Sequence, residues 1–275
     1  SPLYLELETN NPIPLEYAYP FVKKQLYGIK GNVELDKFVV QGQLDNFAVN
    51  GIGHFTDAGF GVDYFKTEYT FNGEIAFNND KIEFEEIRLY DKYQTHADFR
   101  GYIYHEGLQR FIFNLELHKI SNFLVMDTKK GDNELFYGKV FVKDGVADIT
   151  GSLDKLVINA FASSGAGSSL KVPVTYDSEF GRPDYIRFKG DKEEDGKVNT
   201  GLKDMEINLT AYVSEESDVE LIFDERVGDI MRGRGSGNLN MVINTDGDFK
   251  MYGNYEITEG NYLFTAQNVF NKKFQ

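Results

Sequence analysis

The last quarter of the chain alternates apolar and polar residues with almost no interruption. Between positions 205 and 213, apolar side chains occupy every second position: Met205, Ile207, Leu209, Ala211 and Val213. Successive side chains of a β-strand point to opposite faces, so this spacing gives a strand one apolar and one polar face. Shorter stripes follow at Leu221 and Phe223, and then at Leu239, Met241 and Ile243. Consecutive strands that share an apolar face must enclose something apolar.

The composition favours strands over the whole length. A further alternating stripe contains Phe111, Phe113, Leu115 and Leu117, and the chain has 23 Phe and 17 Tyr, which are frequent in sheets. Its 27 Gly, with many Asn and Asp, supply turns. Asn72-Gly73 and Asp144-Gly145 are typical of hairpin turns. The sequence therefore predicts an all-β, predominantly antiparallel fold with little helix.

The charge of the chain argues against nucleic acid as a partner. Asp and Glu number 44 against 29 Lys and Arg, and the formal net charge of −15 would repel a phosphate backbone. The chain has no cysteine, so disulfides and thiol chemistry are excluded. No apolar run approaches the roughly 20 residues of a membrane-spanning helix. Because the chain begins at Ser1 without an initiator methionine, we expect a fragment of a longer protein.

The chain is predicted to contain one large unit after a short lead-in. Residues 1–30 are rich in proline, and we expect a short strand followed by an irregular, extended connection. From 31 to 275, strands are predicted roughly every 8 to 12 residues, as in a single elongated β unit. A long polar loop region is expected near 163–200, around a short strand at 170–174.

Motifs for catalysis or metal binding each fail at a specific position. His105-Glu106 begins like a zinc-protease motif, but Gln109 replaces the second histidine. Residues 191–196 begin like a calcium loop, but Leu202 occupies the position of the closing glutamate, which favours a solvated loop. The four histidines are scattered over separate predicted strands. We therefore predict no enzymatic activity, no cofactor and no metal site.

Two arginines, Arg232 and Arg234, lie in the glycine-rich sequence MRGRGSG. No Lys-Ser or Lys-Thr follows the glycines and no helix is predicted to begin there, which excludes a phosphate loop. The segment is interpreted as a turn or bulge between strands. Alternatively, the two guanidinium groups contact anionic lipid headgroups or an acidic partner.

One segment resembles a known family. The sequence from Leu221 to Phe274 is similar to the C-terminal domain of TamB, the translocation and assembly module subunit of the AsmA-like superfamily, in its Bacteroidetes-like form. The resemblance rests on Asp224-Glu225-Arg226, the GRGSGNL turn and the hairpin GDFKMYGNYEITEGNYLF, in the order of the family. Residues 136–164 are similar to its repeating strand units, whereas residues 1–130 share only their general composition.

The resemblance implies both a shape and a function. Members of the family have an elongated sheet curled lengthwise into a taco-like groove with an apolar interior. They bridge the inner and outer membranes of Gram-negative bacteria in phospholipid transport and outer-membrane protein assembly. We therefore expect a periplasmic segment, anchored through parts outside this chain, with phospholipid and a BamA-family (TamA-like) outer-membrane barrel protein as partners.

The alternating stripes are predicted to line the lipid groove. The lining residues are Phe111, Phe113, Leu115, Leu117, Met205, Ile207, Leu209, Leu221, Phe223, Leu239, Met241 and Ile243. A closed β-sandwich that acts as a scaffold or adhesion module has the same alternation. A transmembrane β-barrel also alternates, although the chain has no Trp for interfacial girdles. A soluble all-β enzyme is a further alternative, because an irregular active site leaves no sequence pattern.

Overall fold

The computed structural model describes residues 3–9, 11–22, 26–43, 46–133, 135–173, 204–224, 228–244, 249–266 and 270–274. Its strands are β1 (Leu3–Leu7), β2 (Ile13–Pro14), β3 (Leu26–Gln43), β4 (Asn46–Val62), β5 (Thr67–Asn79), β6 (Lys81–Asp91), β7 (His96–Glu106), β8 (Gln109–Ser121), β9 (Phe123–Thr128), β10 (Tyr137–Ser152), β11 (Lys155–Ser164), β12 (Ser169–Pro173), β13 (Asp204–Val213), β14 (Asp218–Asp224), β15 (Asp229–Asn244), β16 (Phe249–Ala266) and β17 (Phe270–Phe274). Two short helices, η1 (Leu15–Ala18) and α1 (Tyr19–Val22), follow β2. The predicted all-β class is confirmed.

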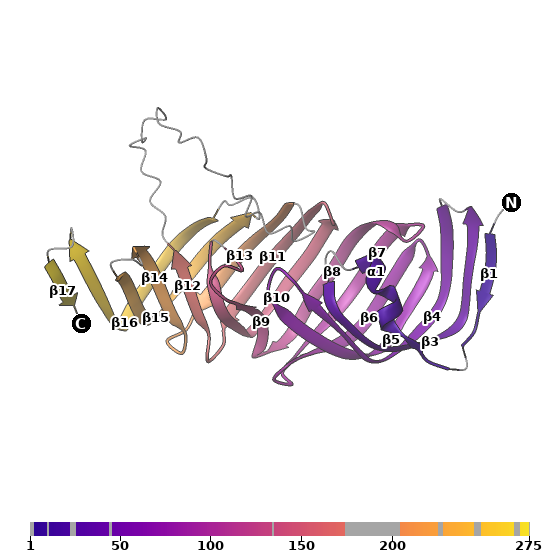
Figure 1. The fold of residues 1–275 in the computed structure, drawn as a ribbon, viewed down its shortest axis with the longest axis horizontal. Coiled ribbons are helices and arrows are strands. Elements are labelled where there is room, and N and C mark those ends of the chain that lie inside the picture. Colours follow the sequence, from indigo (N-terminus) through magenta and orange to yellow (C-terminus); the bar gives the residue numbers. More distant parts are fainter. Residues whose placement is uncertain are drawn as a thin grey trace, which may run out of the picture.

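All 17 strands belong to one sheet that extends along the long axis of the molecule, with β1 near one end and β17 at the other (Figure 1). Consecutive strands pair antiparallel from β3 to β8 and from β15 to β17. Parallel pairs occur between β11 and β13 and between β12 and β14. The prediction of an elongated, mostly antiparallel sheet is therefore confirmed.

Several short strands are the two halves of longer, bent strands. One edge of β10 pairs with β8 and then β9, and its other edge pairs with β11 and then β12. In the parallel pairs the register continues across the break, since Lys155 lies opposite Asp204 and Ser169 lies opposite Asp218 at the same offset. The pairings of β10 to β15 therefore form a ring around the interruptions at 165–168 and 214–217. The level at which β11 and β13 end and β12 and β14 begin is here called the crease.

Serine side chains add hydrogen bonds to the backbone pairing at this crease. The Ser164 hydroxyl oxygen accepts a hydrogen bond from the Ser214 backbone N–H at 2.9 Å and lies 2.7 Å from the Ser217 hydroxyl. The Ser168 hydroxyl oxygen accepts a hydrogen bond from the Phe141 N–H at 3.0 Å. A Cβ atom at Gly165 would lie 2.2 Å from the Asn122 side-chain oxygen, so a larger residue there would displace this side chain. Small polar residues thus let neighbouring strands bend at the same level.

The two hairpin turns predicted from glycine dipeptides are wrong. Asn72-Gly73 lies inside β5 and Asp144-Gly145 lies inside β10. Both dipeptides accompany register shifts, and a Cβ atom at Gly145 would lie only 2.5 Å from the Phe161 carbonyl oxygen. At both positions glycine lies at an irregularity within a long strand and does not turn the chain, and at Gly145 it also admits the neighbouring backbone.

The described part of residues 1–30 contains regular elements. The first strand, β1, pairs with β3 from Leu3 opposite Gly42 to Leu7 opposite Phe38, and β3 already begins at Leu26. In the predicted loop region, β12 coincides with the expected short strand. Residues 174–203, with the candidate calcium loop and Leu202, lie outside the described residues.

Candidate functional site

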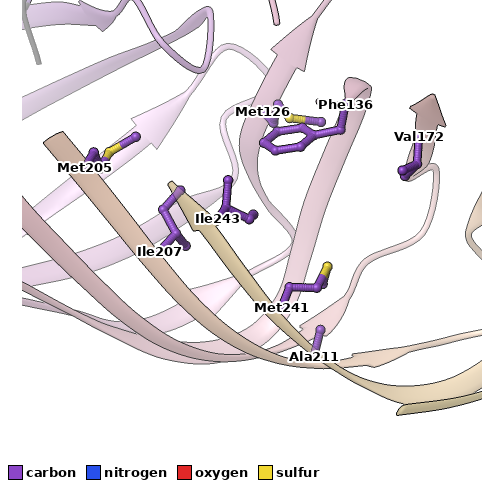
Figure 2. Close-up of a cluster of buried hydrophobic side chains, with 8 residues drawn as sticks. All are labelled: Met126, Phe136, Val172, Met205, Ile207, Ala211, Met241 and Ile243. Carbon is purple, nitrogen blue, oxygen red and sulfur yellow. The ribbon is translucent and has the colours of Figure 1, made fainter. Parts of the chain in front are cut away.

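The apolar faces of β10 to β16 meet in one group of side chains, here called the aliphatic cluster. Its buried members are Met126, Phe136, Val172, Met205, Ile207, Ala211, Met241 and Ile243. Partly buried side chains pack against them: Tyr64, Phe65, Leu135, Val140, Leu156, Ile158, Leu170, Leu209, Leu221, Leu239 and Phe249. Figure 2 shows the buried side chains pointing into an interior that the curved strands surround.

The first half of the sheet encloses a second group, here called the aromatic cluster. Its buried members are Tyr69, Ile75, Ile87, Leu89, Ala97 and Phe123. The partly buried members are Phe55, Phe60, Val62, Phe71, Phe77, Ile82, Phe84, Phe99, Leu117, Ile120 and Val125. They come from β4 to β9, so the two clusters occupy successive sections of the same folded sheet.

Strand register explains why the alternating residues gather. In the antiparallel pair of β13 and β15, Ile207 lies opposite Ile243 and Leu209 lies opposite Met241. In the parallel pair of β11 and β13, Ile158 lies beside Ile207. Directly opposed residues point to the same face of a sheet. The apolar stripe of each strand is therefore continuous with the apolar stripe of the adjacent strand.

Seven of the twelve predicted lining residues lie in the aliphatic cluster. Met205, Ile207, Met241 and Ile243 are buried there, whereas Leu209, Leu221 and Leu239 are partly buried. Leu117 packs in the aromatic cluster instead. The structure thus divides these residues between two sections of the interior.

The other four predicted lining residues lie outside both clusters. Leu115 is buried and lies opposite Ile149 of β10, and Phe113 is partly buried opposite Gly151. The ring of Phe111 contacts that of His105, with 6.4 Å between their centroids. Phe223 follows Ile222, where the register with β15 shifts, and its ring lies 6.1 Å from that of Tyr262.

The two candidate headgroup-binding arginines form ion pairs within the chain. Arg234 pairs with Asp218 through two hydrogen bonds of 2.6 and 3.2 Å, and Arg232 lies 3.4 Å from Glu220. These hydrogen bonds from Arg234 lower the pKa of Asp218. The segment lies inside β15 and does not join two strands as predicted, although the register with β16 shifts between Arg234 and Gly235. The guanidinium charges thus have partners on the neighbouring strand β14.

Sequence reasoning missed the residues of β9 and of the turn between β4 and β5. Phe123 and Met126 are buried in β9, and Tyr64 and Phe65 of the turn pack against the aliphatic cluster. A signal for β9 was available, because the four consecutive apolar residues 123–126 are typical of a strand that is buried on both faces.

The buried polar groups are Thr67, Asp91, Asp98, His105, Thr128, Ser168 and Ser217 among the described residues. Several of these groups form hydrogen bonds with irregular segments of the backbone. Asp91, for example, accepts hydrogen bonds from the N–H groups of Tyr93, Thr95 and Leu124. Burial lowers the pKa of His105. The described residues contain no group of three or more His, Cys, Asp or Glu placed to hold a metal ion. The most extensive arrangements of side chains are therefore the two apolar clusters.

No helix among the described residues is long and apolar enough to cross a membrane. Comparison with known proteins identifies one family, since a model of the TamB C-terminal domain matches residues 85–275. Neither the curated proteins nor the solved structures contain a match. The matched region is more than half of the chain and includes every strand from β7 to β17. The chain therefore belongs to the TamB C-terminal domain family, which is part of the translocation and assembly module.

Proposed function

We propose that the folded sheet binds the acyl chains of phospholipids along its apolar interior. The observation that carries this proposal is the continuity of the apolar faces, which supply two clusters over successive strands from β4 to β16. The two buried carboxylates among the described residues, Asp91 and Asp98, already have partners within the chain: backbone N–H groups for Asp91 and Arg88 for Asp98. An interior of this kind suits a ligand that is long and apolar, whereas it offers no partner to a polar one.

The energetics of lipid transfer fit such an interior. An acyl chain with about 14 methylenes in water carries roughly 0.8 kcal/mol of hydrophobic free energy per methylene, or about 11 kcal/mol in total. Contact with apolar side chains along the path removes most of this cost without any chemical step. The family is non-enzymatic, which agrees with a passive carrier.

The wider role follows from the family. We place the chain in the periplasm of a Gram-negative bacterium, as a segment of a bridge between the inner and outer membranes. The net charge of −15 favours solubility in such an aqueous compartment. Proteins of this family act with TamA-type partners, so a BamA-family outer-membrane barrel protein is the proposed protein partner.

Native mass spectrometry of the chain, purified from a Gram-negative envelope and followed by lipid extraction, tests the proposal. The unmodified chain is expected to carry phospholipid. Leu209→Arg should lower the amount of bound lipid, because a charge placed beside Met241 in the aliphatic cluster is costly to keep among acyl chains. Ile243→Arg should do the same, with a larger loss of stability because Ile243 is 6% exposed.

Thr210→Arg is the matched control for Leu209→Arg. Thr210 is the next residue of β13 and is exposed, with its hydroxyl hydrogen-bonded to the Asn240 side chain at 3.0 Å. This variant should retain its lipid. A lipid-free mass for the unmodified chain, together with unfolding that added phospholipid does not shift, would favour a closed scaffold and refute lipid binding.

A further inference from the structure

Two segments of the described chain contribute side chains to both apolar clusters. In β9, Val125 packs in the aromatic cluster and Met126 is buried in the aliphatic cluster. Near the turn between β4 and β5, Val62 belongs to the aromatic cluster and Tyr64 to the aliphatic cluster. The boundary between the two clusters therefore runs through β9 and this turn.

Protein surrounds β9 on both of its faces. Phe123 and Leu124 are each 1% exposed and Met126 is 4% exposed, so adjacent residues that point in opposite directions are buried. The burial pattern of β15 is different, because its buried Met241 and Ile243 alternate with the less buried Asn240 and Val242. A strand buried on both faces lies inside the fold, and β9 has a different cluster on each face.

Several contacts fix β9 to the first half of the sheet. The rings of Phe123 and Tyr69 stack, with centroids 4.8 Å apart and planes inclined by 14°. The Tyr69 hydroxyl donates a hydrogen bond to the Leu124 carbonyl oxygen at 3.0 Å, and burial raises the pKa of Tyr69. The Leu124 N–H donates to the Asp91 carboxylate at 2.8 Å. These contacts tie β9 to β5 and β6.

The turn between β4 and β5 completes the same boundary. The Asp127 N–H of β9 donates a hydrogen bond to the Phe65 carbonyl oxygen at 2.9 Å. The Tyr64 hydroxyl accepts a hydrogen bond from the Asn133 side chain at 3.1 Å, which holds the segment after β9. The rings of Tyr64 and Phe65 are in edge-to-face contact, with 5.0 Å between their centroids. Backbone and side-chain contacts thus connect the turn to β9 and to the segment that follows it.

We propose that β9 and this turn form a partition that divides the apolar interior into two separate acyl-chain sites. One site lies along the aromatic cluster and the other along the aliphatic cluster. This inference rests on the proposed function, because it concerns how the same interior holds lipid. A lipid tail bound in one section does not extend into the other while Tyr69 and Phe123 remain stacked. Passage along the whole sheet requires β9 to separate from β5.

Neighbouring residues of β9 provide reporters for the two sites. A photoreactive phenylalanine analogue replaces Val125 in one protein and Met126 in another, and each is loaded from phosphatidylethanolamine vesicles and irradiated. Each reporter is then combined with Leu209→Arg in the aliphatic cluster or Phe84→Arg in the aromatic cluster. Leu209→Arg should lower lipid cross-linking from position 126 at least about tenfold and leave position 125 unchanged, because a buried charge excludes lipid only from its own section. Phe84→Arg should have the opposite pattern.

Exposed residues next to each substitution give the controls. Thr210→Arg and Glu85→Arg place an arginine beside Leu209 and Phe84, at exposed positions, and should leave both reporters unchanged. Native mass spectrometry of the chain without reporters provides a second measurement. Each single variant should lose part of the bound lipid and the double variant should lose all of it. Far-UV circular dichroism checks that every variant retains the sheet.

The outcomes separate the two proposals. Selective loss at one reporter, with partial loss of lipid mass, supports the partition. Loss at both reporters from either single substitution would show one undivided interior, so the partition would be wrong while lipid binding stood. No cross-link at either reporter, with no lipid mass in the unmodified chain, would overturn lipid binding and the partition together.

Discussion

The two apolar clusters differ in their side chains although one sheet encloses both. In the aromatic cluster, ring contacts connect Phe55, Phe71, Phe60, Tyr69 and Phe123 in an unbroken series, with centroid distances between 4.8 and 6.4 Å. In the aliphatic cluster, three of the eight buried members are methionines and only one is aromatic. Over all members, eight of the 17 side chains of the aromatic cluster are aromatic, against four of the 19 in the aliphatic cluster, so the first section is richer in rings and the second in flexible or branched chains.

This difference indicates that the two sections contribute differently to stability and to lipid binding. Aromatic rings prefer a few relative orientations, so a series of them holds the surrounding strands in place. Methionine has an unbranched, adaptable side chain that repacks around ligands of different shapes. We therefore expect the aromatic cluster to contribute more to stability, and the aliphatic cluster to accept lipid more readily.

Truncation of one buried side chain in each cluster should produce the largest contrast. Phe123→Ala removes a ring that is 1% exposed and stacked on Tyr69, and should lower the free energy of unfolding by about 4 kcal/mol. Met241→Ala should cost about 2 kcal/mol, because Leu209, which lies opposite and is only partly buried, can partly fill the space. Urea denaturation followed by circular dichroism measures both. Equal losses would remove the proposed difference between the clusters.

The alternating pattern was sufficient to predict the members of the aliphatic cluster on β13 and β15. Met205, Ile207 and Leu209 stand at every second position, and the register of β13 with β15 brings Met241 and Ile243 opposite to two of them. Such residues are predictable because, in a long strand without a bulge, every second side chain continues to point to the same face. Phe223 could not be placed with the same certainty, because the register shifts after Ile222.

The boundary between the clusters depends on contacts that no local pattern encodes. The four apolar residues 123–126 indicate a doubly buried strand, but they do not specify that Tyr69 and Phe65 are its neighbours. Asp144-Gly145 has the composition of a hairpin turn, yet it lies inside β10 because the partner strand continues past it. Both features depend on which strands meet in three dimensions.

Removal of the Asp91 carboxylate should have the second-largest effect and should fall on the aromatic section. Asp91 is 1% exposed and accepts hydrogen bonds from three backbone N–H groups and from the Thr95 hydroxyl. Asp91→Ala leaves these donors without their acceptor, and should cost about 3 kcal/mol. Asp218→Ala, at a half-exposed ion pair beside the aliphatic section, should cost less than about 1 kcal/mol. Denaturation midpoints compare the two; a similar loss for both would argue against a special role for Asp91.

The crease of the second section should depend on serine more weakly. Ser164→Ala removes the acceptor for the Ser214 N–H and the partner of the buried Ser217 hydroxyl, and should cost about 1 kcal/mol. Ser163→Ala is the matched control, because its hydroxyl bonds only an exposed Asp144 carboxylate and its loss should be nearly neutral. Hydrogen exchange at the Ser214 amide gives a local readout. Unchanged exchange in Ser164→Ala would show that the crease does not rely on this side chain.

Acid should affect the first section through one ion pair on β6 and β7. Arg88 forms two hydrogen bonds, of 2.6 and 3.0 Å, with Asp98, whose side chain is 1% exposed, and they lower the pKa of Asp98 from 3.8 to about 2. A carboxyl group whose pKa is lower in the folded state stabilises the fold above its unfolded pKa, and loses this contribution as the pH falls through the folded value. Asp98→Asn should therefore lower stability by about 1 kcal/mol at pH 7, a modest effect because Arg88 is half exposed. The difference from the unmodified chain should shrink between pH 4 and pH 2, where Asp98 becomes protonated in both states. Urea midpoints at pH 7, 4 and 2 measure this difference in stability. A difference that stayed constant over this range would show that the pair of Arg88 and Asp98 acts through packing and not through charge.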